Sequence, residues 1–398
     1  MSGPWGLCVR SLVPNAPSTL RRSPPIVRNG ETVAGLGEIV SDEAFLFIVL
    51  HTLPPLRSVA PVSSSATSAL RATWTPRYVG LVVVPIVLTL LAWGTYMSLE
   101  GLWGLFRTHG FMTLTMVAGS FVAGVSSEGG GAVAYPVMTL VFEIDPAVAR
   151  NFSLAIQSVG MTAAALYIYA RRIPVETTYL WIVALGSVPG LVGGTYFVAP
   201  HVPPAYAKMM FVSFFLSYGL ALYVINHVRD QAAVDRLPAL TLGQQAELIG
   251  IGLIGGLLTS IFGNGVDICS FAFVTLKYRL SEKVATPTSV TLMAFNAVLG
   301  FALHALVIGD MQPEAYRFWW VSIPVVVFGA PLGAYVVSRV HRLYIAGLLY
   351  TVIVVQFVSA LWIIRPGLPL LLFSAGVFAV GAFLFFQLPR WGPAPAPS

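Results

Sequence analysis

Charged residues are scarce in this chain. Asp, Glu, Lys and Arg make up only 10% of its 398 residues, whereas about a quarter of the residues in a soluble domain are charged. Apolar residues make up 57%, and the mean hydropathy is +0.81. They gather in long runs, and a run of about 20 residues spans the roughly 30 Å of hydrocarbon in a bilayer. The sequence therefore predicts an all-α polytopic membrane protein.

Cysteines and catalytic signatures are also missing or few. Cys8 and Cys269 are the only cysteines, lie far apart and form no C-x-x-C motif, so neither a disulfide framework nor a metal site is expected. The sequence contains no G-x-S-x-G, H-E-x-x-H or G-x-x-x-x-G-K-[ST] motif. We therefore expect no enzyme and no cofactor. Without an ATP site, transport would depend on gradients.

The composition changes at residue 78. Residues 1–77 are rich in Pro, Ser and Arg and are expected to be a disordered cytoplasmic extension or the product of an upstream start codon; a regulatory tail is the alternative. The following segments are predicted to be a first transmembrane repeat (78–226), a polar cytoplasmic linker (227–245), a second transmembrane repeat (246–390) and a Pro-rich tail (391–398).

Ten apolar segments follow residue 78, and two of them are interrupted by Gly, Ser and an acid. The interrupted segments are 111–142 and 246–277. About eight uninterrupted segments are predicted to be full transmembrane helices: 79–97, 147–170, 178–197, 205–226, 283–308, 316–338, 342–364 and 367–388.

The two interruptions belong to an internal repeat. Residues 119–153 align without gaps with residues 255–289, a constant 136 positions later, and seven of the 35 pairs are identical. Backbone that leaves the helix at membrane depth is tolerated only where it is buried in protein or lines a wet cavity. Paired breaks in two halves indicate the substrate site of a transporter.

Positive charge favours a topology in which each interrupted segment is a re-entrant hairpin. The hairpin arrangement places twelve Lys and Arg on one side of the membrane and five on the other, whereas single crossings give ten and seven. Positive residues collect on the cytoplasmic side. We therefore predict two inverted repeats, both termini in the cytoplasm, and a multi-pass protein of the plasma membrane whose partner is the lipid bilayer and not nucleic acid.

Two acids stand out. Residues 78–388 contain twelve Asp and Glu, of which only Glu128 and Asp267 fall well inside apolar segments, both in the interruptions. Intramembrane ionisable residues are costly and are functional candidates by default. Each is a candidate for ion coupling, with H⁺ as the ion. The alternative is that each caps the half-helix that starts after the break.

Small and polar residues at the breaks are the candidate substrate ligands. Glycines let a ligand approach the backbone, and a helix N-terminus that follows them favours an anion; packing of small residues between helices is the alternative. The first set is Ser126, Ser127, Gly129, Gly130, Gly131, Gly263, Asn264 and Gly265.

Further candidates begin the helices that follow the hairpins. They are Arg150, Asn151, Ser153, Thr288 and Ser289. Arg150 could hold an anion at the outer mouth or snorkel to the interface. Gln157 and Asn296 lie deeper and fit hydrogen-bonding between helices. His304 lies near a helix end, which favours an interfacial position over a proton relay.

Several of these stretches resemble the TauE/SafE sulfite exporter family. They are A-G-V-S-S-E-G-G-G-A-V-A-Y-P-V-M-T-L (123–140), A-R-N-F-S (149–153), T-S-I-F-G-N-G-V-D (259–267) and A-T-P-T-S (285–289). The resemblance covers roughly residues 78–390. It implies two homologous halves and transport, usually outward, of small organosulfur anions or oxyanions such as sulfite or sulfoacetate. Ser127 and Glu128 depart from the residues common in the family.

Three functions remain to be separated. The first is a proton-coupled secondary transporter of such an anion, or of another small carboxylate, held between the two breaks. The second is an uncoupled anion channel, and the third is a scaffold in which the glycines only pack helices. Paired midplane breaks in inverted halves favour the carrier. Whether the chain forms a homodimer is left open.

Overall fold

The structure is a computed structural model of the whole chain. It describes residues 75–125, 130–227, 234–337 and 342–391. The predicted ligands Ser126, Ser127 and Gly129, the predicted coupling residue Glu128, and nearly all of the predicted extension lie outside this part of the chain.

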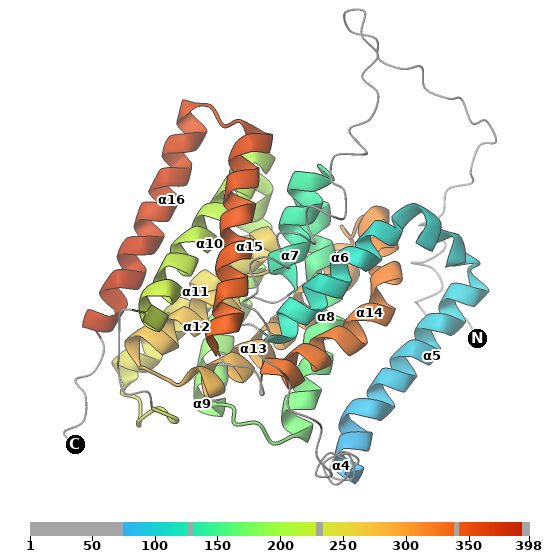
Figure 1. The fold of residues 1–398 in the computed structure, drawn as a ribbon, viewed down its shortest axis with the longest axis horizontal. Coiled ribbons are helices and arrows are strands. Elements are labelled where there is room, and N and C mark those ends of the chain that lie inside the picture. Colours follow the sequence, from blue (N-terminus) through green and yellow to red (C-terminus); the bar gives the residue numbers. More distant parts are fainter. Residues whose placement is uncertain (1–74, 126–129, 228–233, 338–341, 392–398) are drawn as a thin grey trace, which may run out of the picture. The chain divides into compact units, whose positions relative to one another are not determined.

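The described residues form helices and no sheet (Figure 1). In chain order they are α4 (Pro76–Tyr78), η1 (Val79–Val83), α5 (Val84–Leu99), η2 (Leu102–Gly104), α6 (Leu105–Val125), α7 (Gly131–Pro136), η3 (Val137–Val141), α8 (Pro146–Ala170), α9 (Thr177–Gly193), η4 (Gly194–Val198), η5 (Ala199–His201), α10 (Pro204–His227), α11 (Leu242–Phe262), α12 (Val266–Lys277), α13 (Glu282–Ala302), η6 (Leu303–Ile308), α14 (Pro313–Val337), α15 (Arg342–Ile364), α16 (Leu368–Gln387) and η7 (Leu388–Arg390).

Nine helical spans in the described part are long and apolar enough to cross a membrane. Seven of them coincide with full helices predicted from sequence. The eighth predicted helix is α15, within which Leu349–Ile364 forms a shorter apolar stretch. The other two spans, Leu102–Val125 and Leu242–Phe262, are the first arms of the interrupted segments. Each interrupted segment therefore has one long arm and one short arm, a difference that the sequence did not indicate.

Capping residues decide where key helices begin and end. Asp145 accepts a hydrogen bond from the N–H of Ala147 (2.8 Å) at the start of α8, and Pro146 occupies the first helical position, where proline costs no hydrogen bond. Thr241 and Gln244 form a reciprocal capping box at the start of α11. Gly263 ends α11 with a φ of 74°, a conformation that glycine adopts without strain.

Each interrupted segment doubles back on itself, as the hairpin prediction requires. Gly255 in α11 approaches Val266 at the start of α12, so that a Cβ on Gly255 would lie 2.7 Å from the Val266 Cα. Gly119 in α6 approaches Gly130 in the same way, since a Cβ on Gly119 would lie 3.6 Å from the Gly130 carbonyl oxygen. These two pairs are equivalent at the 136-residue offset of the sequence repeat.

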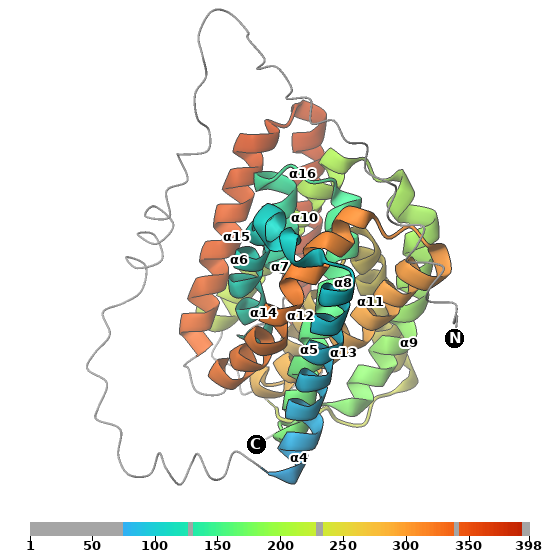
Figure 2. The same ribbon diagram turned by 90° about the vertical axis from the view of Figure 1, so that its right-hand side faces the viewer.

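The two halves exchange their long arms. α6 packs along α14 of the second half, and α11 packs along α9 of the first half (Figures 1 and 2). Glycines permit both approaches: a Cβ on Gly124 would overlap the Ala330 carbonyl oxygen, and one on Gly252 would overlap that of Val183. Small residues allow membrane helices to pack this closely. α8 and α13, equivalent in the repeat, also pack together.

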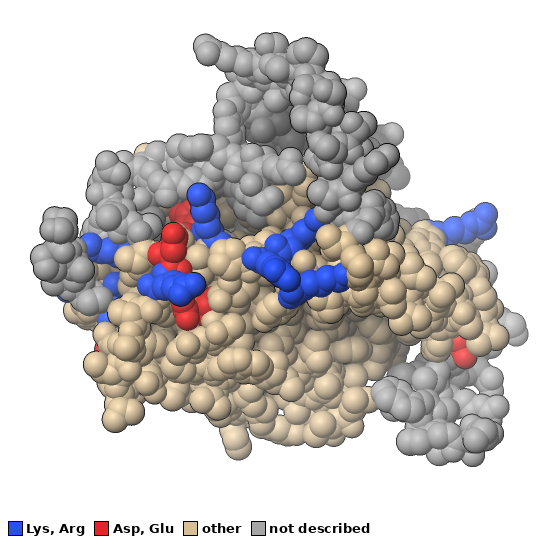
Figure 3. Space-filling model, turned by 90° about the horizontal axis from the view of Figure 1, so that it is seen from below, with Lys and Arg blue, Asp and Glu red and all other residues tan. Residues whose placement is uncertain are grey.

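Basic residues gather at the end of the bundle that contains α4. The Arg171 guanidinium, just after α8, lies 4.5 Å from the centre of the Tyr78 ring in α4. Viewed from this end, the surface shows a group of Lys and Arg side chains (Figure 3). This is the end on which the sequence analysis placed the larger share of positive charge.

Candidate functional site

The residue that follows the first break meets the second break inside the bundle. We call the break between α6 and α7 tip 1 (126–130) and the break between α11 and α12 tip 2 (263–265). Gly131, which follows tip 1, lies against tip 2: a Cβ at this position would be 3.1 Å from the Asn264 Cβ and 3.0 Å from the Gln157 Nε2. The packing leaves no room for a side chain at Gly131, and Asn264 is fully buried.

Helix α8 provides the polar surface on which the tips meet. Gln157 Nε2 donates to the Gly263 carbonyl oxygen (2.8 Å) and to the Ser153 Oγ (2.8 Å), and Ser153 Oγ donates to the same carbonyl (3.3 Å). Both side chains are buried. The Gln157 Oε1 atom has no hydrogen-bond partner among the described residues. Gln157 thus ties α8 to tip 2, as predicted for a residue that bonds neighbouring helices.

Asp267 caps the second half-helix. Its Oδ1 accepts hydrogen bonds from the N–H groups of Gly265 (3.1 Å) and Ile268 (3.0 Å). Its Oδ2 is buried and has no partner in the described part of the chain. Ser289 Oγ donates to the Asp267 carbonyl oxygen (2.9 Å) and anchors this tip to α13. The capping alternative for Asp267 therefore has a geometric basis, and one carboxylate oxygen remains for another role.

We predict that Asp267→Ala destabilises the protein by about 2 kcal/mol, because a lost cap and unsatisfied buried N–H groups each cost about 1–2 kcal/mol. Asp267→Asn keeps an oxygen that can accept both bonds and is the matched control. Thermal unfolding in detergent measures the difference. Equal losses in the two variants would contradict the capping role.

Other predicted ligands lie away from the tips. Thr288 Oγ1 accepts a hydrogen bond from the N–H of Glu176 (2.9 Å) and donates to the Val284 carbonyl oxygen (2.6 Å), at the start of α9. Arg150 and Asn151 belong to a second polar cluster, at the beginning of α8. The structure therefore brings together Gly131, Ser153, 263–265 and Ser289. The Arg150 carbonyl oxygen also lies against Gly263, where a Cβ would be 2.5 Å from it, whereas the side chains of Arg150, Asn151 and Thr288 have other partners.

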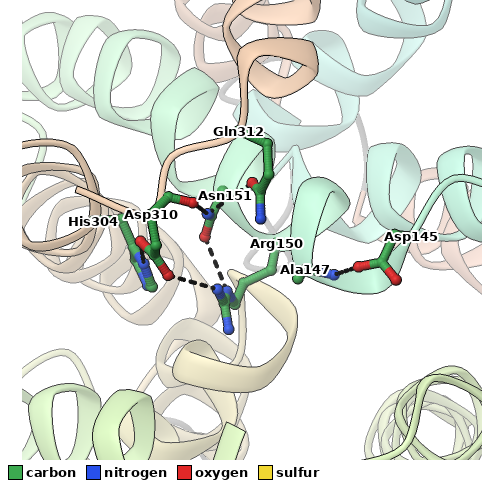
Figure 4. Close-up of polar contacts among 7 residues, drawn as sticks. All are labelled: Asp145, Ala147, Arg150, Asn151, His304, Asp310 and Gln312. Carbon is green, nitrogen blue, oxygen red and sulfur yellow. Dashed lines mark hydrogen bonds and ion pairs between the residues drawn. The ribbon is translucent and has the colours of Figure 1, made fainter. Parts of the chain in front are cut away.

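The second cluster joins α8 to the loop before α14 (Figure 4). Arg150 forms an ion pair with Asp310 (3.7 Å), and its Nε donates to the Asn151 Oδ1 (3.0 Å). Asn151 Nδ2 donates to the Gln312 Oε1 (2.9 Å). Asp310 also pairs with the His304 Nδ1 at 2.7 Å. One carboxylate thus lies between a guanidinium and an imidazole.

A cavity of about 470 Å³ opens beside this cluster, and we call it the vestibule. Arg150, Asp310 and Gln312 line it on one side, and Tyr196 and Asp145 also contribute. Arg150 is 8% exposed. In the described residues no group of three or more His, Cys, Asp and Glu side chains is placed to hold a metal ion. The vestibule therefore offers hydrogen-bond donors and positive charge beside one shared carboxylate.

Sequence reasoning did not single out Asp310 or Gln312 as functional residues. The side chain of His304 is fully buried, and its predicted position at the membrane interface stays a prediction. Gly309, with a φ of 73°, ends η6 and turns the chain so that Asp310 pairs with His304. A histidine followed six residues later by an acid, with a glycine between them, was the available signal.

The comparisons with known proteins agree with this geometry. A protein-family model described as "Sulfite exporter TauE/SafE" matches residues 111–363. The chain belongs to the TauE/SafE family. Both broken segments, both tips and the vestibule cluster fall within the matched range. TauE/SafE proteins are transporters, so this chain is a multi-pass membrane transporter and not an enzyme, and the family implies a small anionic substrate.

Two further comparisons gave no match. Neither the curated proteins nor the solved structures contain a chain that matches this member of the TauE/SafE family.

Proposed function

We propose that the protein is a secondary transporter that exports a small organosulfur anion or oxyanion, such as sulfite or sulfoacetate, bound between the two tips. The observation that carries the proposal is the meeting of Gly131 with tip 2 over Ser153 and Gln157. Buried polar side chains beside irregular backbone at membrane depth are typical of a ligand site. The sulfur-containing substrate class comes from the family.

The proposed topology has eight full helices and two re-entrant hairpins, in two inverted repeats. The doubling back of each broken segment supports it, as does the exchange of long arms between halves. The basic residues at the α4 end (Figure 3) support a cytoplasmic location for that end. The proposed membrane is the plasma membrane, with both termini in the cytoplasm.

Transport is proposed to be coupled to protons through Glu128, with Asp267 as the second candidate. Both are acids of the breaks, and Asp267 retains one carboxylate oxygen without a described partner. We expect Glu128→Gln to exchange anion between the two sides of the membrane but to lose uphill uptake driven by a pH gradient. Asp267→Asn, which preserves the cap, tests Asp267 in the same way. Wild-type proton coupling in both variants would remove both acids from the mechanism.

Counterflow in proteoliposomes tests the proposed function directly. Vesicles that contain purified protein and unlabelled sulfite should take up labelled sulfite faster than protein-free vesicles, and sulfoacetate, taurine and lactate as competitors define the substrate class. Stronger competition by lactate than by sulfoacetate would favour a carboxylate transporter. No exchange from folded protein would contradict the proposal for these anions.

An uncoupled anion channel is the second candidate, favoured only by the vestibule of about 470 Å³. A channel does not couple inward movement of one anion to outward movement of another, and its flux is insensitive to an imposed pH gradient. Uptake of labelled sulfite that is accelerated by unlabelled sulfite inside the vesicles therefore indicates a carrier and not a channel.

A further inference from the structure

The shared carboxylate of Asp310 is the feature of the vestibule that tip-centred transport does not explain. Asp310 Oδ2 faces the Arg150 guanidinium at 3.7 Å, a longer contact than the 2.7 Å between its Oδ1 and the His304 Nδ1. An ionised carboxylate only accepts hydrogen bonds, so the His304 Nδ1 must carry the hydrogen. The Nε2 atom is then the position that gains a proton, and it has no partner among the described residues.

The charges of this triad balance only in certain combinations. A neutral His304, an ionised Asp310 and Arg150 sum to zero. A monovalent anion alone leaves the cluster with one negative charge, and a proton alone leaves it with one positive charge. The side chains of Arg150 and His304 are buried, whereas that of Asp310 is 41% exposed. Unpaired charge on the two buried side chains is costly, so uptake of anion and proton together is the favoured way to load the site.

We propose that the vestibule is a second anion site in which Arg150 binds the anion, Asp310 is the internal competitor, and protonation of His304 draws Asp310 away. Protonated His304 forms a charge-assisted bond with Asp310, which is stronger than the neutral one. The Arg150 fork is then free to accept a carboxylate, sulfonate or sulfite group in the bidentate way that guanidinium favours. This inference rests on the proposed function only for the chemical class of the anion.

The internal repeat does not reproduce this cluster. The position equivalent to Arg150 in the second half is Thr286, at the same offset of 136 residues. Thr286 lies in the first turns of α13, the helix equivalent to α8. The end of α8, equivalent to the end of α13 and η6, contains no histidine. The ionic triad therefore belongs to one end of the transporter only.

Other ionisable groups lie near the triad. Arg150 and Asp310 are the charged residues that interact electrostatically with His304. Asp145 and Tyr135 interact with Arg150 in addition to Asp310, and Lys208 on α10 interacts with both Asp145 and Glu143. Asp145 is also engaged in capping α8. Among these described groups, His304 is the one whose ordinary change of charge falls between about pH 5 and 8.

Isothermal titration of the purified full-length protein with methanesulfonate tests the inference, because this monoanion keeps its charge over that pH range. The measurement is made in the Gly131→Val variant, whose side chain displaces the polar groups at the tips. Binding should tighten as pH falls, by up to about tenfold per pH unit, the limit for one linked proton.

Three variants assign this linkage to its groups. The glutamine of His304→Gln can still donate a hydrogen bond to Asp310 but cannot be protonated. The affinity of this variant for methanesulfonate should therefore not change with pH. Asp310→Asn removes the competitor, and should bind at every pH as tightly as the parent does at low pH. Arg150→Gln should lose binding, with partial recovery in Arg150→Lys.

The outcomes separate this inference from its competitors. A purely structural role for Asp310 predicts weaker binding in Asp310→Asn, which would overturn the proposal. A pH slope retained in His304→Gln would assign the proton to Asp310 and overturn the role of His304. pH-linked binding without counterflow would support the vestibule site and count against transport at the tips, whereas counterflow without vestibule binding would do the reverse.

Discussion

Valine in place of Gly131 is expected to slow counterflow by about tenfold to a hundredfold while the protein remains folded. Overpacking costs about 1–3 kcal/mol, and if the anion-bound state bears this cost, each 1.4 kcal/mol weakens anion binding about tenfold. The atoms that the new side chain meets are the Ser153 Oγ, the Gln157 Nε2 and the Asn264 Cβ. These are side-chain atoms and can move, but they are also the polar groups proposed to surround the anion.

Gly110→Val is the matched control for this prediction. Gly110 lies on α6, the long arm of the same broken segment, and a Cβ there would meet nothing within 4 Å. Both variants should elute as monodisperse protein, Gly131→Val should unfold at a lower temperature than Gly110→Val because of overpacking, and only Gly131→Val should lose exchange. Wild-type counterflow in Gly131→Val would show that the anion does not pass between the tips.

The position of the breaks was predictable because its signal is local. Gly, Ser and an acid within a run of apolar residues mark backbone that cannot remain helical in lipid without a compensating environment. The constant offset of the repeat aligns Gly119 with Gly255 in the sequence. In the described residues α11 ends at its C-cap, Gly263, Gly255 approaches Val266, and Gly119 approaches Gly130.

The partners of the breaks were not predictable in the same way. That Gln157 bonds the Gly263 carbonyl depends on how α8 crosses tip 2, a contact 106 residues apart in sequence. The contacts of the triad also depend on tertiary packing. In sequence, Asp310 lies outside the apolar segments. Only the turn at Gly309 and the approach of α8 place its carboxylate between His304 and Arg150. Side-chain pairing of this kind is determined by tertiary packing, not by periodicity.

The exchange of long arms also escaped sequence reasoning, although the glycines that permit it were visible. Glycine clusters in membrane helices fit both ligand sites and close helix packing. The structure separates the two uses by position. Gly131 and 263–265 lie at the tips, whereas Gly186 and Gly252 face backbone atoms of the opposite helix at the α9–α11 crossing.

This crossing carries the largest predicted effect on stability. A Cβ on Gly252 would overlap the Val183 carbonyl oxygen and lie 3.0 Å from the Ser187 backbone nitrogen. Both are backbone atoms of α9, which cannot rotate away as a side chain can. We expect Gly252→Val to destabilise the transporter by about 3 kcal/mol or more, the upper part of the range for overpacking, because α9 and α11 must separate along their length.

Gly250→Val provides a control on the same helix. A Cβ on Gly250 would meet nothing within 4 Å, so this substitution adds the same apolar volume and the same hydropathy to α11 without a clash. The yield of monodisperse protein and the unfolding temperature in detergent measure both variants. Gly250→Val should match the wild type and Gly252→Val should not; equal behaviour of the two would mean that α9 and α11 do not make this contact in the membrane. In that case the exchange of arms between halves, and with it the apposition of the two tips on α8, would lose its support.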